Sequence, residues 1–144
     1  MSQISRSALV PYSAEQMYRL VNDVDSYPQF LPGCTGSRVL DASDDQMTAS
    51  VDVSKAGISK TFVTRNTLTD NQSIKMQLVD GPFRKLSGGW RFTALSEEAC
   101  KVELNLDFEF TNMLVELAFG RIFKELASSM VQAFTQRAKE VYSA

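Results

Sequence analysis

The sequence predicts an α+β fold in which a curved antiparallel sheet of six or seven strands wraps one long C-terminal helix. Residues 37–110 alternate apolar and polar side chains in short runs separated by turn residues, as antiparallel strands do. Residues 112–142 place apolar side chains three and four positions apart, as an amphipathic helix does. The residues of this apolar stripe are Val115, Phe119, Ile122, Phe123, Leu126, Met130, Phe134, Ala138 and Val141. No repeat or linker divides the chain, so we expect a single domain over residues 1–144.

The N-terminal elements are predicted to be a strand and two short helices. We expect the strand at residues 3–10, because Pro11 ends the alternation. Ser13 and Gln16 have the spacing of a capping box, which predicts the start of a helix. A second short helical or turn segment is expected at residues 25–31, where two prolines bound it closely.

The central part of the chain reads as a meander of strands. Tight turns rich in Gly, Asp and Asn separate the alternating runs, which favours hairpins over parallel crossovers. One face of each run is apolar and the other polar, so the sheet has one dry side. The strands are expected at residues 37–42, 46–54, 60–69, 73–79, 85–93 and 101–110.

The C-terminal segment from Asn112 to about Tyr142 contains one glycine and no proline. A continuous helix of this length measures roughly 45 Å, enough to lie across the dry side of the sheet. Gly120 interrupts the apolar pattern. It indicates either close packing of the helix backbone or room for a ligand or a hinge.

A twisted sheet that curls round a helix cannot touch it everywhere, so large side chains fill the gap or a cavity remains. The facing positions are rich in flexible and aromatic groups, which suit an apolar pocket for a lipid-like ligand. Simple core packing is the alternative interpretation of each of them. The predicted walls are Val51, Val53, Met76, Leu78, Trp90, Phe92, Leu104, Leu106, Phe119, Phe123 and Met130.

The net charge of −2 is unevenly distributed. Residues 1–54 carry −4, residues 55–91 carry +5 and residues 92–144 carry −3, which sum to −2. The basic segment predicts one positively charged surface that could contact RNA, although a solvated strand face is the alternative. We expect no DNA partner. The candidate RNA-binding cations are Lys55, Lys60, Arg65, Lys75, Arg84, Lys85 and Arg91, with Lys55 and Lys60 flanking a hairpin tip.

The amino-acid composition argues against several classes of function. The chain has no histidine, which removes the commonest general base and metal ligand. Cys34 and Cys100 are far apart and are expected to be reduced thiols, so we predict no metal site, no catalytic residues and no enzyme. The chain has neither a membrane-spanning apolar run nor the apolar core of a signal peptide, which predicts a cytoplasmic protein.

Sequence segments along essentially the whole chain resemble one family. The segment Val21–Cys34 (VNDVDSYPQFLPGC), together with VDVSKAGISKTF, LVDGPF, LSGGWRF, DFEFTN and AFGRIFKELA, is similar to the START-like family of coenzyme Q-binding proteins and bacterial ribosome association toxins. The resemblance implies the helix-grip (START-like, Bet v 1-like) fold. It also implies a lid over the pocket, made of Tyr27, Phe30, Leu31 and Pro32.

The resemblance implies two activities, neither of them enzymatic. The first is that of a toxin–antitoxin protein that binds the large ribosomal subunit and inhibits subunit joining and translation initiation. The alternative is binding of ubiquinone or another isoprenoid lipid in the pocket to support respiration, with peripheral membrane contact and no resident cofactor. Some START-like relatives cyclise polyketides, but the alternation places Asp52 and Glu103 on the wet face, away from any pocket.

Overall fold

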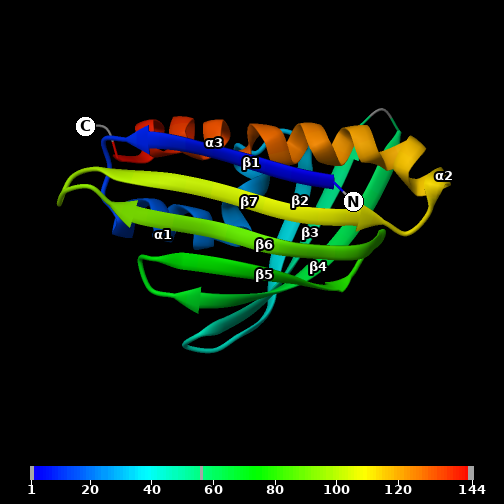
Figure 1. Ribbon diagram of the computed structural model, residues 1–144, viewed down its shortest axis with the longest axis horizontal. Helices are drawn as coiled ribbons and strands as arrows, with labels where there is room; N and C mark the ends of the chain where they lie inside the picture. Colours follow the sequence, from blue (N-terminus) through cyan, green and yellow to red (C-terminus); the bar gives the residue numbers. More distant parts are fainter. Residues whose placement is uncertain (1, 56, 143–144) are drawn as a thin grey trace.

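The computed structural model describes residues 2–55 and 57–142, and in them the predicted sheet is confirmed with seven antiparallel strands. The long helix lies along the sheet, the first short helix lies toward one end, and the short turn that precedes the long helix lies at the other end (Figure 1). The strands are β1 (Ser2–Val10), β2 (Cys34–Ala42), β3 (Gln46–Lys55), β4 (Ile58–Thr69), β5 (Ser73–Asp80), β6 (Phe83–Ala94) and β7 (Cys100–Phe110).

The strand order is β1-β7-β6-β5-β4-β3-β2, so β2 to β7 form a meander and β1 pairs with β7 from outside it. In the β1–β7 pair, Ile4 faces Leu106 and Val10 faces Cys100. The strands β1 and β2 are therefore the two edges of the sheet, although only the two short helices separate them in sequence.

The short helices connect the two sheet edges. Helix α1 (Ala14–Asn22) begins with the predicted capping box: Ser13 Oγ accepts from the Gln16 backbone N–H, and the Gln16 side chain accepts from the Ser13 N–H. The 3₁₀ helix η1 (Val24–Gln29) follows at once. The apolar stripe of both helices packs into the core, so that they close one end of the space beneath the sheet.

The predicted continuous helix is interrupted near its start. It consists of one turn, α2 (Met113–Val115), then a π-helical segment, η2 (Glu116–Gly120), and the long helix α3 (Arg121–Tyr142). Gly120 ends η2 beside the ring of Phe110, where an added Cβ would lie 3.4 Å from Cε2, which is close to an ordinary contact distance. Helical periodicity does not reveal one wider turn, which is why the sequence missed η2.

The core lies between the sheet and α3. Phe108 on β7, Phe119 on η2 and Phe134 on α3 are completely buried there, as is Met17 on α1. Val141 belongs to the predicted apolar stripe of the helix but is exposed. No helix in residues 2–55 and 57–142 is both long and apolar enough to cross a membrane.

Strand β6 curves along the molecule and contains two adjacent glycines with positive φ (Figure 1). Gly88 and Gly89 have φ values of +124° and +154°. A Cβ on Gly88 would lie 2.1 Å from the carbonyl oxygen of Asn105, and one on Gly89 would lie 2.1 Å from that of Ile74. Only glycine fits both positions, and this curvature wraps the sheet round the helix.

Candidate functional site

A cavity of about 60 Å³ lies between the sheet and α3. Strands β3 to β7 supply one side of it, and η1 and α3 supply the other. The lining is almost entirely apolar. The lining residues are Val24, Tyr27, Leu31, Ala49, Val51, Phe62, Thr64, Asn66, Met76, Leu86, Trp90, Leu106, Phe123, Leu126, Ala127 and Met130.

Two polar side chains from β4 point into this cavity. Thr64 and Asn66 are 5% and 6% exposed, and the Thr64 hydroxyl donates to Oδ1 of Asn66 at 2.9 Å. The amide of Asn66 also carries N–H donors at Nδ2, and its side chain lines the cavity. The cavity can therefore hold an acceptor, such as a water molecule or a carbonyl oxygen.

The size of the cavity limits what it holds in this conformation. A cavity that accommodates a benzene ring measures about 150 Å³, whereas one water molecule needs roughly 10–15 Å³. At about 60 Å³ the cavity has room for a few waters and none for a quinone ring. A larger ligand requires η1 or α3 to move away from the sheet.

Part of the predicted pocket lines this cavity. The side chains come from the lid segment, from four of the strands and from α3, as the alternation and the helical spacing indicated. Whether they bind a ligand stays a prediction. The predicted residues found in the lining are Tyr27, Leu31, Val51, Met76, Trp90, Leu106, Phe123 and Met130.

The other predicted pocket residues do not line the cavity. Leu104 and Phe119 are completely buried inside the packed core, and Phe92 packs on Tyr18 and Trp90. Alternation identifies the dry face of a strand, but not where along that face the packing leaves a gap. The residues placed outside the cavity are Phe30, Pro32, Val53, Leu78, Phe92, Leu104 and Phe119.

The predicted lid is firmly attached to the rest of the protein. The buried Tyr27 hydroxyl donates to the carbonyl oxygen of Val21. The ring of Phe30 packs edge-on against Phe134, and the guanidinium of Arg137 lies 5.0 Å above it. Pro32 and Val53 instead border a shallow surface depression of about 210 Å³. Only the inner part of the lid segment, through Tyr27 and Leu31, reaches the cavity.

Sequence reasoning missed the polar part of the lining and the apolar residues Val24, Ala49, Phe62, Leu86 and Ala127. Thr64 and Asn66 are polar side chains at inward-facing positions of β4, so they break the alternation that identified the other strands. This break in the alternation could have identified them, because a polar residue on the buried face of a strand is uncommon and often marks a site.

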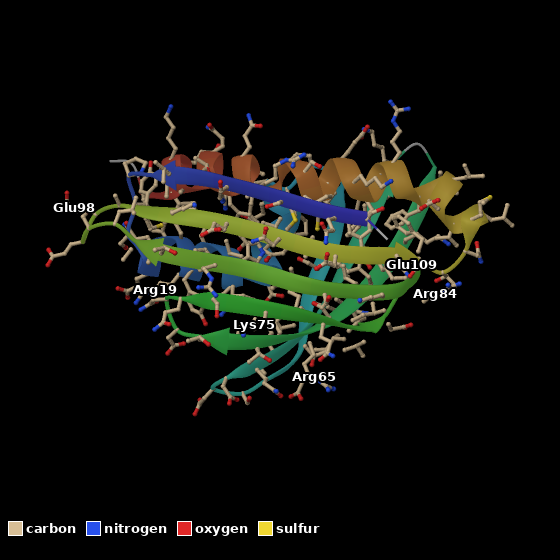
Figure 2. The ribbon with its side chains drawn as sticks, viewed as in Figure 1. Arg19, Arg65, Lys75, Arg84, Glu98 and Glu109 are labelled. Carbon is tan, nitrogen blue, oxygen red and sulfur yellow. The ribbon has the colours of Figure 1, made fainter. Side chains whose placement is uncertain are left out.

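The predicted cations do not form one surface. Asn105 lies on the outer side of β7, because its neighbours Leu104 and Leu106 are buried on the inner side. The strand pairing aligns Asn105 with Gly89 and Gly89 with Lys75, so Lys75 shares that outer side. By the same alternation Arg65, Lys75, Lys85 and Arg91 belong to the outer face, away from α3. Figure 2 shows Lys75 and Arg65 well apart from Arg84, which lies at the end near α2.

Two of the three remaining cations, Lys55 and Arg84, are engaged in ion pairs. Lys55 Nζ lies 2.8 Å from Oε2 of Glu125 on α3, and this contact holds the pKa of that carboxyl below its usual value. Arg84 Nη1 lies 3.4 Å from Oε1 of Glu109. In the described part of the chain, no ion pair involves Lys60 or the four outer-face cations.

A groove of about 480 Å³ runs over the outer face at the glycines of β6. Gly88 and Gly89 form its floor, Lys75 and Arg91 contribute positive charge, and Asp107 contributes one negative charge. We define the outer cation face as Arg65, Lys75, Lys85 and Arg91. Exposed, unpaired cations beside bare backbone are suited to contact the phosphates of a nucleic acid.

The cysteines form no site. Cys34 and Cys100 are free and buried, and burial raises the pKa of both thiols, which makes them unreactive. Among the residues that the structure describes, no cluster of His, Cys, Asp and Glu could hold a metal ion.

Comparison with known proteins assigns the fold and the family. The chain belongs to the polyketide cyclase / dehydrase and lipid transport family, whose model matches residues 10–135. Over 144 residues it is 78% identical to a protein named ribosome association toxin RatA from Escherichia coli (strain K12), with 100% of this chain and 91% of that protein covered. The resemblance found in the sequence is therefore confirmed.

A more distant relative represents the other branch of the family. It is named coenzyme Q-binding protein COQ10 homolog B, mitochondrial, from Xenopus laevis. It is 29% identical over 144 residues, and the match covers 97% of this chain and 59% of that protein.

Solved structures confirm the predicted helix-grip, START-like fold. The Zhui aromatase/cyclase from Streptomyces sp. R1128 superposes with a TM-score of 0.87 at 17% identity, covering 99% of this chain and 96% of its own. A START superfamily protein from Mycobacterium smegmatis gives a TM-score of 0.80 at 23% identity, covering 96% and 98%. These identities establish the fold alone, so the cyclase activity does not transfer, and the relative at 78% identity is named as a toxin rather than an enzyme.

Proposed function

We propose that this chain is a non-enzymatic cytoplasmic protein that binds the large ribosomal subunit and inhibits subunit joining, and with it translation initiation. The observation that carries the proposal is the 78% identity, over the whole chain, to a protein named ribosome association toxin RatA. The outer cation face supports it physically, because ribosomal RNA presents closely spaced phosphates that bind unpaired cations.

Co-sedimentation with purified large subunits at increasing salt tests this proposal. We expect association to weaken steeply with salt, because each cation that contacts a phosphate releases counterions. Lys75→Glu/Arg91→Glu should weaken association at least about tenfold and flatten the salt dependence. The control Lys124→Glu/Lys139→Glu makes the same charge change on exposed positions of α3 and should bind normally. Salt-independent binding, or equal loss in both variants, would refute the electrostatic contact.

The cavity supports a second candidate function, binding of ubiquinone or a similar isoprenoid. It is apolar except for the Thr64–Asn66 pair, which offers a hydrogen-bond donor to a ligand carbonyl. A relative named as a coenzyme Q-binding protein is 29% identical to this chain. Because the cavity is small in this conformation, the proposal requires a second, more open conformation.

Native mass spectrometry of protein purified from respiring cells tests this second candidate. A bound isoprenoid should be detected in the wild type and lost in Ala49→Val, since Ala49 lines the cavity and is 3% exposed. Leu40→Val is the control, because Leu40 is 51% exposed on β2. Protein that carries no isoprenoid, or an Ala49→Val variant that keeps it, argues against the cavity as the binding site.

A further inference from the structure

Three large apolar side chains project from the end of the molecule where α2 and η2 begin. Met113, Leu114 and Leu117 are 73%, 77% and 75% exposed. Figure 1 shows this turn at one extreme of the long axis. A single exposed leucine is ordinary, but three within five residues make a contiguous apolar patch, and such patches mark interaction sites. We define residues 113–117 as the apolar tip.

The exposure of the apolar tip is built into the structure. Asn112 caps the turn, because its Oδ1 accepts from the Val115 N–H at 2.9 Å. Two residues after the tip, Phe119 is completely buried, with its ring centre 6.2 Å from that of Phe110. Gly120 then lies against the same Phe110 ring. Since the segment is fixed at both ends, Leu114 and Leu117 face outward and have no alternative place in the core.

Charged side chains surround the apolar tip, and cations outnumber carboxylates among them. Arg84 Nη2 donates to the carbonyl oxygen of Thr111 at 3.4 Å, directly before the tip. The side chain of Arg121, directly after it, is 91% exposed. Figure 2 shows Arg84 and Glu109 at this end of the sheet. The cations on these neighbouring segments are Lys55, Arg84, Lys85, Arg121 and Lys124, and the carboxylates are Asp80, Glu109, Glu116 and Glu125.

We propose that the apolar tip inserts into the headgroup region of a lipid surface that contains anionic lipids. The Asn112 cap on the Val115 N–H and the hydrogen bond from the Glu116 N–H to the Asn112 carbonyl oxygen satisfy part of the backbone of this turn, which lowers the cost of entering this region. Leucine and methionine then reach the acyl boundary, while the flanking arginines stay with the phosphates. A convex tip fits a fluid surface without a matching pocket, whereas a protein partner would have to supply one.

The proposal goes beyond ribosome binding and does not depend on it. It bears on the second candidate function, because the apolar tip and the cavity are joined by packed aromatic rings. The ring centre of Phe119 lies 6.1 Å from that of Phe123, and Phe123 lines the cavity. Phe123 also packs on Phe62, another cavity residue. The end of the molecule that meets the lipid is therefore contiguous with the wall of the cavity.

Flotation of the full-length protein with vesicles tests the proposal. Vesicles of phosphatidylcholine with phosphatidylglycerol should carry wild-type protein upward, and pure phosphatidylcholine vesicles should carry less of it. Leu114→Gln/Leu117→Gln should reduce binding about tenfold or more, because these two leucines supply most of the apolar contact when the lipid buries them. Leu9→Gln/Leu95→Gln is the matched control, since Leu9 near the end of β1 and Leu95 directly after β6 are 71% and 56% exposed.

Thermal unfolding verifies that both variants fold, which is expected because all four leucines are exposed. The proposal is overturned if wild-type protein stays unbound on both vesicles, or if the tip variant floats as well as the control. It is also overturned if the tip variant floats normally but loses co-sedimentation with large ribosomal subunits. In that case the tip is a macromolecular contact and no lipid anchor. Failure of ribosome binding alone leaves the vesicle result unchanged.

Discussion

Among the described residues that line the cavity, Asn66 is the one with a side-chain amide. Its inward-facing position explains why the two faces of β4 could not be told apart from the sequence. The strand itself was predicted within two residues of its observed bounds. Its inward face could not be assigned, because Thr64 and Asn66 are polar and the dry face was identified by apolar side chains. Local sequence patterns do not record a hydrogen bond that two polar groups make to each other inside a core.

The Thr64–Asn66 pair gives a prediction for stability. Thr64→Val leaves the buried Asn66 amide without a protein partner, which should lower the free energy of unfolding by about 1–3 kcal/mol. Thr64→Val/Asn66→Leu replaces both groups by apolar ones and should recover most of that loss. Urea unfolding of the wild type and both variants measures these differences. A double variant less stable than Thr64→Val would contradict the explanation.

Tyr27 gives a prediction for alkaline pH. Burial, followed by the nearby Cys34 and Asp23, raises its pKa above the unfolded value of 10.0. The folded state therefore keeps the proton when the unfolded state has lost it, so this stabilisation is complete below pH 10 and declines above it. Stability measured from pH 9 to 11.5 should fall more steeply in wild type than in Tyr27→Phe, by up to about 1.4 kcal/mol per pH unit. Parallel curves would exclude this role of burial.

At the scale of elements, the long helix shows both the strength and the limit of periodicity. Spacings of three and four correctly predicted its extent to Tyr142 and the burial of Phe119, Phe123 and Phe134. The π-helical segment η2 was missed, because a single widened turn does not alter the pattern of spacings of three and four enough to be recognised.

The glycine pair in β6 gives a prediction at this scale. Gly89→Ala would place a methyl group 2.1 Å from the Ile74 carbonyl oxygen in a backbone conformation that alanine avoids. We expect a loss of about 3 kcal/mol or more, or failure to fold. Thr93→Ala, on an exposed position of the same strand, should stay within about 0.5 kcal/mol of wild type. Chemical unfolding of both proteins makes the comparison, and a stable Gly89→Ala protein would show that glycine is dispensable at this position.

At the scale of the whole molecule, the charge segregation seen in the sequence was real but its geometry was not predictable. Residues 55–91 are basic, yet the pairing of β4, β5 and β6 places Arg65, Lys75 and Arg91 on the outer face. Lys55 instead reaches Glu125 on α3. The charges counted along a sequence do not show on which face of a strand each charged residue lies. The overall fold was predictable, because alternation, turns and one long helix all indicated the same arrangement.

The proposed activity of this protein is to associate with the large ribosomal subunit and to keep the subunits apart. Light scattering of separated bacterial subunits, mixed with messenger and initiator transfer RNA, measures their joining directly. We predict that the wild-type protein slows joining when it is added first to the large subunit, and that Lys75→Glu/Arg91→Glu does so only at much higher concentration. Joining that proceeds at an unchanged rate with saturating wild-type protein would contradict the proposed function.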